Sequence, residues 1–375
     1  MLRHYRRYWA PLSGFLLALP LLVGALTSGG KPVSTIEARS LAPTPAFPHD
    51  FAAWRNLPRQ TDAYLRDHFG LRQIFLRAYG FIMSRGPFQT GNPMVLAGSD
   101  GRMFFRGDQM VQQSAGLIRR DEQVAETADL LASMQTLLAA RGTRLLVASP
   151  PNSATIYPDQ LPLWARNRGQ RTEYDVFLDD LAARGIQAID LRPALIAAKA
   201  EGKVYRTNDT HWTALGAVAA FNAIVQADSH PDWKLDPARV LGAPETIVGG
   251  DLARMLGTAD NMKETDRLSA LPPGKREDLD KVKQNTAALA TSDHSGPTIM
   301  IIGDSFTGDF FLSMLLQDTG RVVWLHHSFC GFDWKWIDQL RPDEVWWMPT
   351  ERYIVCGKGG VRPVGLPPLE TAGEH

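Results

Sequence analysis

The sequence has little cysteine, no excess of one charge and no internal repeat. Two cysteines in 375 residues exclude a disulfide-rich scaffold, and no Cys/His cluster has the spacing of a zinc site. Basic and acidic residues number 40 each, which argues against a dedicated nucleic-acid-binding protein. Phosphate-cradling Walker and Gly-x-Gly-x-x-Gly loops are also absent. Small molecules, proteins and polysaccharides remain as partners.

The N-terminus has the layout of an export signal. Three arginines within the first seven residues precede an apolar stretch from about residue 8 to residue 26. A buried helix is the alternative, but Pro11 and Pro20 interrupt the stretch. The length is about one bilayer span, and no Ala-x-Ala cleavage site follows. We therefore expect residues 1–30 to be a signal peptide or signal-anchor, and we favour the retained anchor.

The positive flank fixes the expected compartment. Because positive charge stays inside, residues after about 30 should lie in the periplasm, anchored in the inner membrane by the N-terminal helix. Residues 31–50 contain four prolines and few apolar residues, and this composition predicts an extended linker. The first thirty residues hold three arginines and no acidic residue, so the exported part is faintly acidic.

The rest of the chain alternates between helix-like and strand-like segments. An aromatic-rich, helix-compatible stretch over 51–85 comes first. Apolar spacing predicts helices over about 121–141, 171–184, 213–226 and 307–318, and continuous apolar runs predict strands at 145–148, 186–191, 298–302, 322–326 and 344–348. This order is typical of an α/β fold with a parallel sheet flanked by helices, whose site lies at the carboxyl ends of the strands.

Two segments at such strand ends offer catalytic groups. Ser305 follows the strand at 298–302, where a strand-to-helix turn exposes a hydroxyl beside backbone N–H groups, although a plain helix N-cap is the alternative. Asp209 lies two residues before His211, so it can hold one ring nitrogen while the other faces a hydroxyl. A structurally bonded histidine is the alternative there. Together the three residues match the roles of a Ser-His-Asp triad.

These motifs resemble a known family. Asp-Thr-His-Trp at 209–212, followed by Gly-Asp-Ser-Phe at 303–306, is similar to the AlgJ/AlgX-type polysaccharide O-acetyltransferases. Segments at 41–45, 67–72, 98–105, 150–158 and 250–252 agree, so the resemblance covers roughly 37–355. It implies an SGNH-hydrolase-like catalytic domain over 51–375. The Asp-x-His pair precedes the serine, an order permuted relative to ordinary SGNH esterases.

The resemblance also implies a function. In the periplasm, Ser305 would take an acetyl group with His211 as the base and Asp209 fixing its tautomer, and would pass it to a sugar hydroxyl. The implied partners are an exported polysaccharide, a membrane-bound O-acyltransferase that supplies acetyl groups, and other export proteins. No metal or cofactor is needed. The faintly acidic charge weakly favours a neutral acceptor such as cellulose over alginate. An acetyl esterase with the same triad, or a non-catalytic polysaccharide-binding scaffold, are the alternatives.

Further residues are weaker candidates. Ordinary SGNH enzymes also use a Gly and an Asn as oxyanion donors, and that Asn has no evident counterpart here. Arg352, held by Glu351, is expected to substitute for it, with a structural ion pair as the alternative. For substrate contacts we expect an aromatic group to serve, and the candidates are Phe306, Trp212, Tyr157, and Trp334 or Trp336.

The two cysteines have matching positions. Cys330 and Cys356 each follow an apolar strand-like run, so both should lie just past the carboxyl ends of neighbouring strands. Outside the cytoplasm they can form a disulfide. Two free buried thiols are the alternative.

Overall fold

The computed structural model describes most of the chain after residue 41. The described residues are Trp9, 11–15, Leu19, 33–34, 39–40, 42–68, 93–228, 230–280, 286–308, 310–356 and 361–368. They fall into two units, 1–97 with 248–263, and 98–247 with 264–375. The expected signal-anchor lies almost wholly outside the described residues. Within the described part, none of the helices combines the length and the apolar character needed to span a bilayer.

Among its described residues, the first unit has one long helix. Helix α2 (Phe51–Asp67) begins where Asp50 Oδ1 accepts a hydrogen bond from Ala53 N at 2.7 Å. Its C-terminal end holds the preceding segment, because Asp67 Oδ2 accepts from Ala42 N at 2.8 Å. The expected linker contains two short paired strands, β1 (Val33–Ser34) and β2 (Arg39–Ser40), and no regular structure over 42–49. The described part of the aromatic-rich stretch forms α2, and 69–92 lies outside the described residues.

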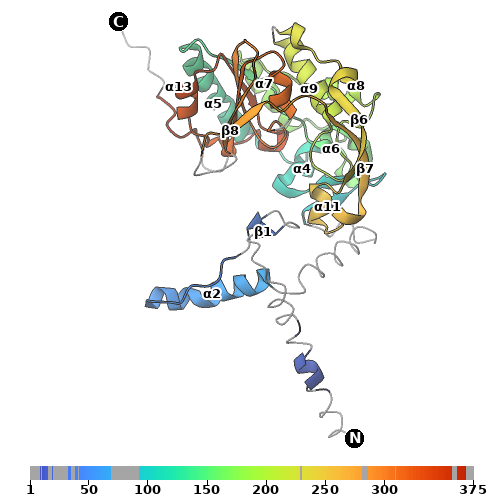
Figure 1. Ribbon diagram of the computed structural model, residues 1–375, viewed down its shortest axis with the longest axis vertical. Coiled ribbons are helices and arrows are strands. Elements are labelled where there is room, and N and C mark those ends of the chain that lie inside the picture. Colours follow the sequence, from blue (N-terminus) through green and yellow to red (C-terminus); the bar gives the residue numbers. More distant parts are fainter. Residues whose placement is uncertain are drawn as a thin grey trace. The chain divides into compact units, whose positions relative to one another are not determined.

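The second unit is built on a six-stranded sheet (Figure 1). In spatial order its strands are β5 (Arg144–Val147), β12 (Glu344–Met348), β10 (Thr298–Gly303), β11 (Arg321–His326), β9 (Ala287–Thr291) and β8 (Lys275–Asp278). The first four are parallel, whereas β9 and β8 are antiparallel to their neighbours. The prediction of a parallel sheet was therefore wrong at one edge. Strand β8 consists of four charged residues and is exposed along its whole length, whereas β9 is a short, alanine-rich strand.

The predicted strand at 186–191 is reduced to a single bridge. Val147 pairs in parallel with Ala188, and Ile189 N donates to Val147 O at 2.8 Å. Asp190 then accepts from Arg192 N at 3.0 Å and starts helix α8 (Arg192–Ala198). The chain turns away from the sheet at this point because the Asp190 side chain forms a hydrogen bond with the following backbone.

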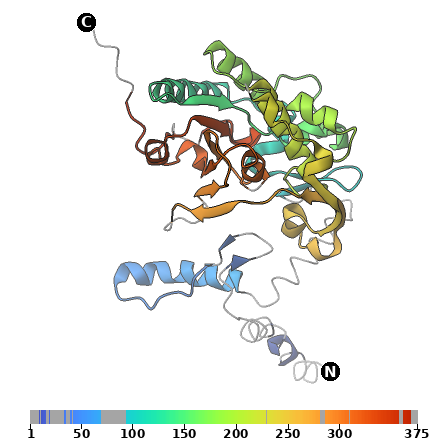
Figure 2. The ribbon, with the colours of Figure 1, turned by 45° about the horizontal axis from the view of Figure 1, so that its top comes forward.

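Helices cover both faces of the sheet (Figures 1 and 2). Helices α5 (Asp121–Ala139), α7 (Glu173–Ala183) and α13 (Lys335–Leu340) share one apolar cluster with alternate residues of the parallel strands, such as Met300 and Trp347. Helices α9 (Ala214–Ala227) and α12 (Phe310–Leu315) lie on the other face, where Phe221 contacts Phe311 and Trp346. Successive residues of a strand point to opposite faces of the sheet. The two tryptophans of β12 therefore pack against the helices on different faces.

Shorter elements complete the described chain. They are β3 (Val95–Ala97), β4 (Met103–Phe105), η2 (Gly107–Gln109), α4 (Met110–Ser114), α6 (Ser153–Ile156), η3 (Pro158–Gln160), η4 (Leu163–Ala165), η5 (Pro231–Trp233), α10 (Pro237–Val240), β6 (Leu241–Val248), α11 (Asp251–Met255), η6 (Ala259–Asn261), β7 (Lys263–Ser269), η7 (Ser328–Cys330) and η8 (Glu351–Tyr353).

The aromatic contacts behind the sheet should carry much of the stability of this unit. Phe221 is fully buried between Phe311 and Trp346, so Phe221→Ala leaves a cavity and should lower the free energy of unfolding by about 3–5 kcal/mol. Denaturant titration measures the loss. The control is Ile196→Ala on α8, whose side chain is 53% exposed and should matter little. Equal losses in the two variants would contradict this packing.

Candidate active site

The turn after β10 presents Ser305. Asp304 is buried, and its Oδ1 accepts from Phe306 N at 3.0 Å, while Thr307 N donates to the Asp304 carbonyl at 3.1 Å. These bonds delay the start of α12 to Phe310 and leave Ser305 exposed. Gly303 is required before the turn, because a Cβ there would lie 2.4 Å from Thr307 Oγ1.

His211 comes from the loop that precedes α9. Tyr205 and Trp212 form an antiparallel bridge, and Thr213 caps α9 by accepting from Gly216 N at 3.1 Å. His211 is therefore fixed between a bridge and a helix start. Its backbone N–H donates to Asp209 Oδ1 at 2.9 Å, which is the short-range turn that the spacing allows.

The three predicted catalytic residues come together. Asp209 Oδ1 lies 2.6 Å from His211 Nδ1, and His211 Nε2 lies 2.8 Å from Ser305 Oγ. Exposure rises along the series, since Asp209 is buried, His211 is half-buried and Ser305 is exposed. This order of carboxylate, imidazole and hydroxyl is the arrangement that makes a serine hydroxyl nucleophilic.

Phe306 and Trp212 are buried residues next to the catalytic serine and histidine. The buried Phe306 ring lies 5.0 Å from the His211 ring, and Trp212 Nε1 donates to the Phe306 carbonyl at 3.0 Å. Trp212 is 1% exposed and stacks on Phe311. The expected contact of Trp212 and Phe306 with substrate is therefore corrected, because both side chains are buried. They position the serine turn against the histidine.

Burial also corrects two of the other expected aromatic contacts, those of Tyr157 and Trp334. Tyr157 is buried, and its hydroxyl accepts from Val204 N at 3.1 Å, so it braces the chain ahead of the histidine loop. Trp334 is fully buried in the apolar cluster, and Trp336 packs against the same cluster. Tyr157 and Trp334 are therefore no open platform for a sugar, whereas Trp336 is partly exposed and its contact with substrate stays a prediction.

Arg352 lies close to the serine turn, but not as predicted. The Glu351 carboxylate accepts from Asn152 N and Thr155 Oγ1, each at 2.7 Å, so it does not hold Arg352. Arg352 itself is 8% exposed, with its guanidinium carbon 5.3 Å from the centre of the Phe306 ring. Burial opposes its charge, but the fields of Asp304 and Asp108 and the contacts with Tyr353 together outweigh it and raise the pKa of Arg352.

Asp304 links two strand ends, a role that sequence reasoning missed. Its Oδ2 accepts from Thr350 N at 3.0 Å and from Thr350 Oγ1 at 2.5 Å, which joins the turn after β10 to the turn after β12. Burial opposes ionisation, but Arg352 and the Thr350 hydrogen bonds outweigh it and keep the pKa of Asp304 below its usual value. The signal was present, because both residues follow apolar runs that become neighbouring strands.

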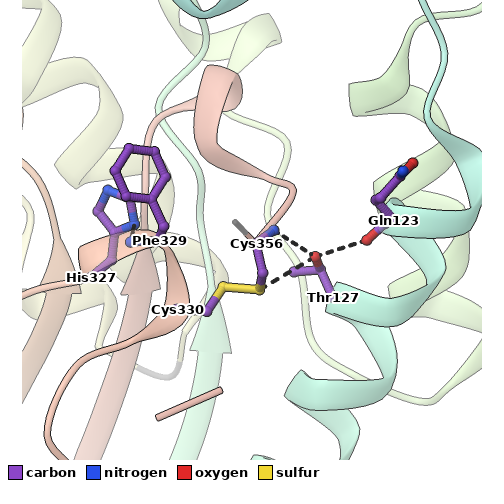
Figure 3. The surroundings of a disulfide bond; sticks show 6 residues. All are labelled: Gln123, Thr127, His327, Phe329, Cys330 and Cys356. Atoms are coloured by element: carbon purple, nitrogen blue, oxygen red, sulfur yellow. Dashed lines mark hydrogen bonds between the residues drawn. A yellow bond between two sulfur atoms is a disulfide. The ribbon is translucent and has the colours of Figure 1, made fainter. Parts of the chain in front are cut away.

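The turn after β11 completes this edge of the sheet. His327 N donates to the Gly303 carbonyl at 2.8 Å, and His327 Nδ1 accepts from Phe329 N at 3.1 Å. Burial lowers the pKa of His327 to about 4, so the ring is neutral at pH 7. Cys330 and Cys356 form a disulfide, and Cys356 N donates to Thr127 Oγ1 at 3.2 Å (Figure 3). The turns after β11 and β12 are thus covalently joined.

Comparison with known proteins identifies the family of the chain. A family model described as "SGNH hydrolase-like domain, acetyltransferase AlgX" matches residues 95–346. The chain belongs to this family. The resemblance predicted from the motifs is confirmed, and the expected enzyme class, an acyltransferase, agrees with the family's description.

Individual relatives agree with this assignment. The probable alginate O-acetylase AlgJ of Pseudomonas putida is 29% identical over 247 residues, which are 65% of this chain and 59% of that protein. The chain thus spans less than two thirds of that relative. The Pseudomonas aeruginosa protein of the same name is 32% identical over 130 residues, 35% of this chain and 32% of that one.

A solved structure supports the fold. PatB1 of Bacillus cereus matches with a TM-score of 0.52 at 12% identity, over 70% of this chain and 97% of that chain. At this identity the likeness concerns the fold alone. A mixed α/β fold with a central sheet and helices on both faces is therefore shared with a known structure.

The buried carboxyl of Glu351 should make stability depend on pH. Burial raises its pKa from 4.5 to about 7, so the folded state favours the protonated form. That contribution is complete below about pH 4.5 and is lost as the pH rises through 7. Because glutamine carries no ionisable carboxyl, the Glu351→Gln variant should not lose stability in this way as the pH rises. The free energy of unfolding of the variant, relative to wild type, should therefore rise between pH 4.5 and pH 8, on the order of 3 kcal/mol.

Denaturant unfolding across this pH range measures the difference. Glu122→Gln, at an exposed position of α5, is the matched control and should give a flat difference. If the difference in the free energy of unfolding between Glu351→Gln and wild type also stays constant with pH, the raised pKa of Glu351 is contradicted.

Proposed function

We propose that this protein is an O-acetyltransferase that moves acetyl groups onto an exported polysaccharide through an acetyl-serine intermediate. The observation that carries the proposal is the continuous hydrogen-bonded series from Asp209 through His211 to the exposed Ser305. A triad of this kind suits acyl transfer, because the imidazole removes the hydroxyl proton as the serine attacks. Membership of a family described as an acetyltransferase supports the same chemistry.

The proposed reaction has two steps. In the first, His211 Nε2 takes the proton of Ser305 as Oγ attacks the acetyl carbonyl, and the donor group leaves with that proton. In the second, His211 takes a proton from a sugar hydroxyl, which attacks the acetyl-serine. The acetyl ester moves to the sugar and the proton returns to Ser305 Oγ. Asp209 keeps the Nδ1 proton in place and stabilises the imidazolium in both steps.

The wider setting is part of the proposal. The relatives are named as alginate O-acetylases, which favours a polysaccharide acceptor. We place the reaction in the periplasm, with the protein held at the inner membrane by its N-terminal segment. A membrane-bound O-acyltransferase would supply the acetyl groups, and other export proteins would deliver the polymer.

Removing the serine hydroxyl should abolish the acetyl-enzyme. The full chain, incubated with an activated acetyl ester, should gain one acetyl group in an intact-mass spectrum, and Ser305→Ala should gain none at this site. Because the hydroxyl is exposed, the melting temperature of the variant should stay close to that of wild type. Oligosaccharides added afterwards should receive the acetyl group.

Thr155→Ser, which keeps a hydroxyl beside Glu351, serves as a control that should still be acetylated. Wild-type-like acetylation of Ser305→Ala would contradict the proposed nucleophile. Release of free acetate in the presence of the acceptor sugar would replace the transferase by an esterase.

A further inference from the structure

The turn after β11 has an unusual backbone that holds an aromatic side chain in solvent. Ser328, Phe329 and Cys330 have φ values of 49°, 52° and 71°, in the left-handed region, and none of them is glycine. Side chains with a Cβ are unfavourable there, and single residues of this kind concentrate at functional sites. Phe329 is 49% exposed, so its burial in the core does not compensate for this conformation.

The surrounding contacts keep this turn in place. Phe329 N donates to His327 Nδ1 at 3.1 Å, and Ser328 N donates to His326 Nδ1 at 3.0 Å. The disulfide of Cys330 then ties the turn to the segment after β12. Figure 3 shows the Phe329 ring beside the His327 imidazole, with the disulfide leading toward Thr127. An exposed aromatic ring is thus held rigidly at the edge of the sheet.

Phe329 is connected to the catalytic residues through a series of side-chain contacts. Its ring centre lies 5.3 Å from that of Tyr353, at 88°. The guanidinium carbon of Arg352 lies 4.9 Å from the Tyr353 ring centre and 5.3 Å from that of Phe306. Phe306 contacts His211. The aromatic pair therefore lies at the same edge of the sheet as Ser305.

The chemistry of this pair suits a sugar ring. A pyranose has apolar C–H faces that pack on aromatic rings and hydroxyl edges that form hydrogen bonds. Phe329 offers the apolar surface, and the half-buried Tyr353 carries a hydroxyl that donates to Asp108 Oδ2 at 3.2 Å. Asp108 is also left-handed, with φ 53°. An apolar ring with polar groups at its rim is the composition of a binding site for a ligand of mixed polarity.

We propose that Phe329 and Tyr353 form an aromatic platform that binds a pyranose ring of the acceptor polysaccharide beside Ser305. The assignment of the ligand as an acceptor rests on the proposed function. The platform takes the part that Trp212 and Trp334 cannot take, because those side chains are buried. It is a specificity-determining surface, and it leaves the chemistry of the triad to Ser305, His211 and Asp209.

Binding without turnover tests the platform. The full chain carrying Ser305→Ala is titrated with an alginate hexasaccharide and with cellohexaose, and the dissociation constants are compared with those of Ser305→Ala/Phe329→Ala. Loss of one aromatic contact should weaken binding of the preferred oligosaccharide by about tenfold. Phe329→Trp in the same background should restore binding, because it keeps a large aromatic surface.

Trp164→Ala is the matched control, since Trp164 is also 49% exposed but belongs to η4. It should leave the dissociation constants unchanged. Opening the disulfide with a reductant should weaken binding in the Ser305→Ala background and add nothing once Phe329 is alanine.

The outcomes separate the platform from the proposed function. Equal dissociation constants with and without Phe329, or no binding of either oligosaccharide to the Ser305→Ala chain, would overturn the platform. Oligosaccharide binding that depends on Phe329, in a protein whose Ser305 accepts no acetyl group, would support the platform and contradict the transferase.

Discussion

The buried carboxylate of Asp304 is the interaction on which the candidate site depends. One oxygen holds the turn that carries Ser305, and the other holds Thr350 at the end of the neighbouring strand. A buried carboxylate without partners would be strongly disfavoured, but hydrogen bonds and the charge of Arg352 keep it ionised. The position of the nucleophile and the position of the turn after β12 are therefore set together. Loss of this carboxylate would remove a hydrogen-bond acceptor from both turns.

The two halves of the site reach this edge by different routes. The serine turn, Arg352 and the disulfide-bonded turns all follow parallel strands, so strand register fixes their spacing. The histidine loop belongs to no strand of the main sheet and is fixed by its own bridge and the cap of α9. The contact between the halves is made by Phe306, which packs on His211 while its carbonyl accepts from Trp212. Burial of this contact, rather than the triad hydrogen bonds alone, aligns the hydroxyl and the imidazole.

Sequence patterns predicted the elements whose signals are local. The strands β10, β11 and β12 are continuous apolar runs, and the Asp-x-His spacing is short enough for a turn to impose its geometry. Strand β8 escaped prediction because its stability comes from pairing with β9 and not from an apolar pattern. The tryptophans were misjudged for a related reason. Adjacency to His211 along the chain does not predict whether a side chain is exposed. Trp212 is buried because it packs against Phe311.

The disulfide connects the site to the environment in which the protein would work. Three consecutive left-handed residues beside Cys330 are unfavourable, and a covalent tether to Cys356 is one way to keep them in that conformation. Such a bond persists in an oxidising compartment and is rare in the cytosol. The disulfide thus supports the proposed periplasmic location. Both cysteines of the chain are used in this one bond, which ties the turn bearing Phe329 to the segment after β12.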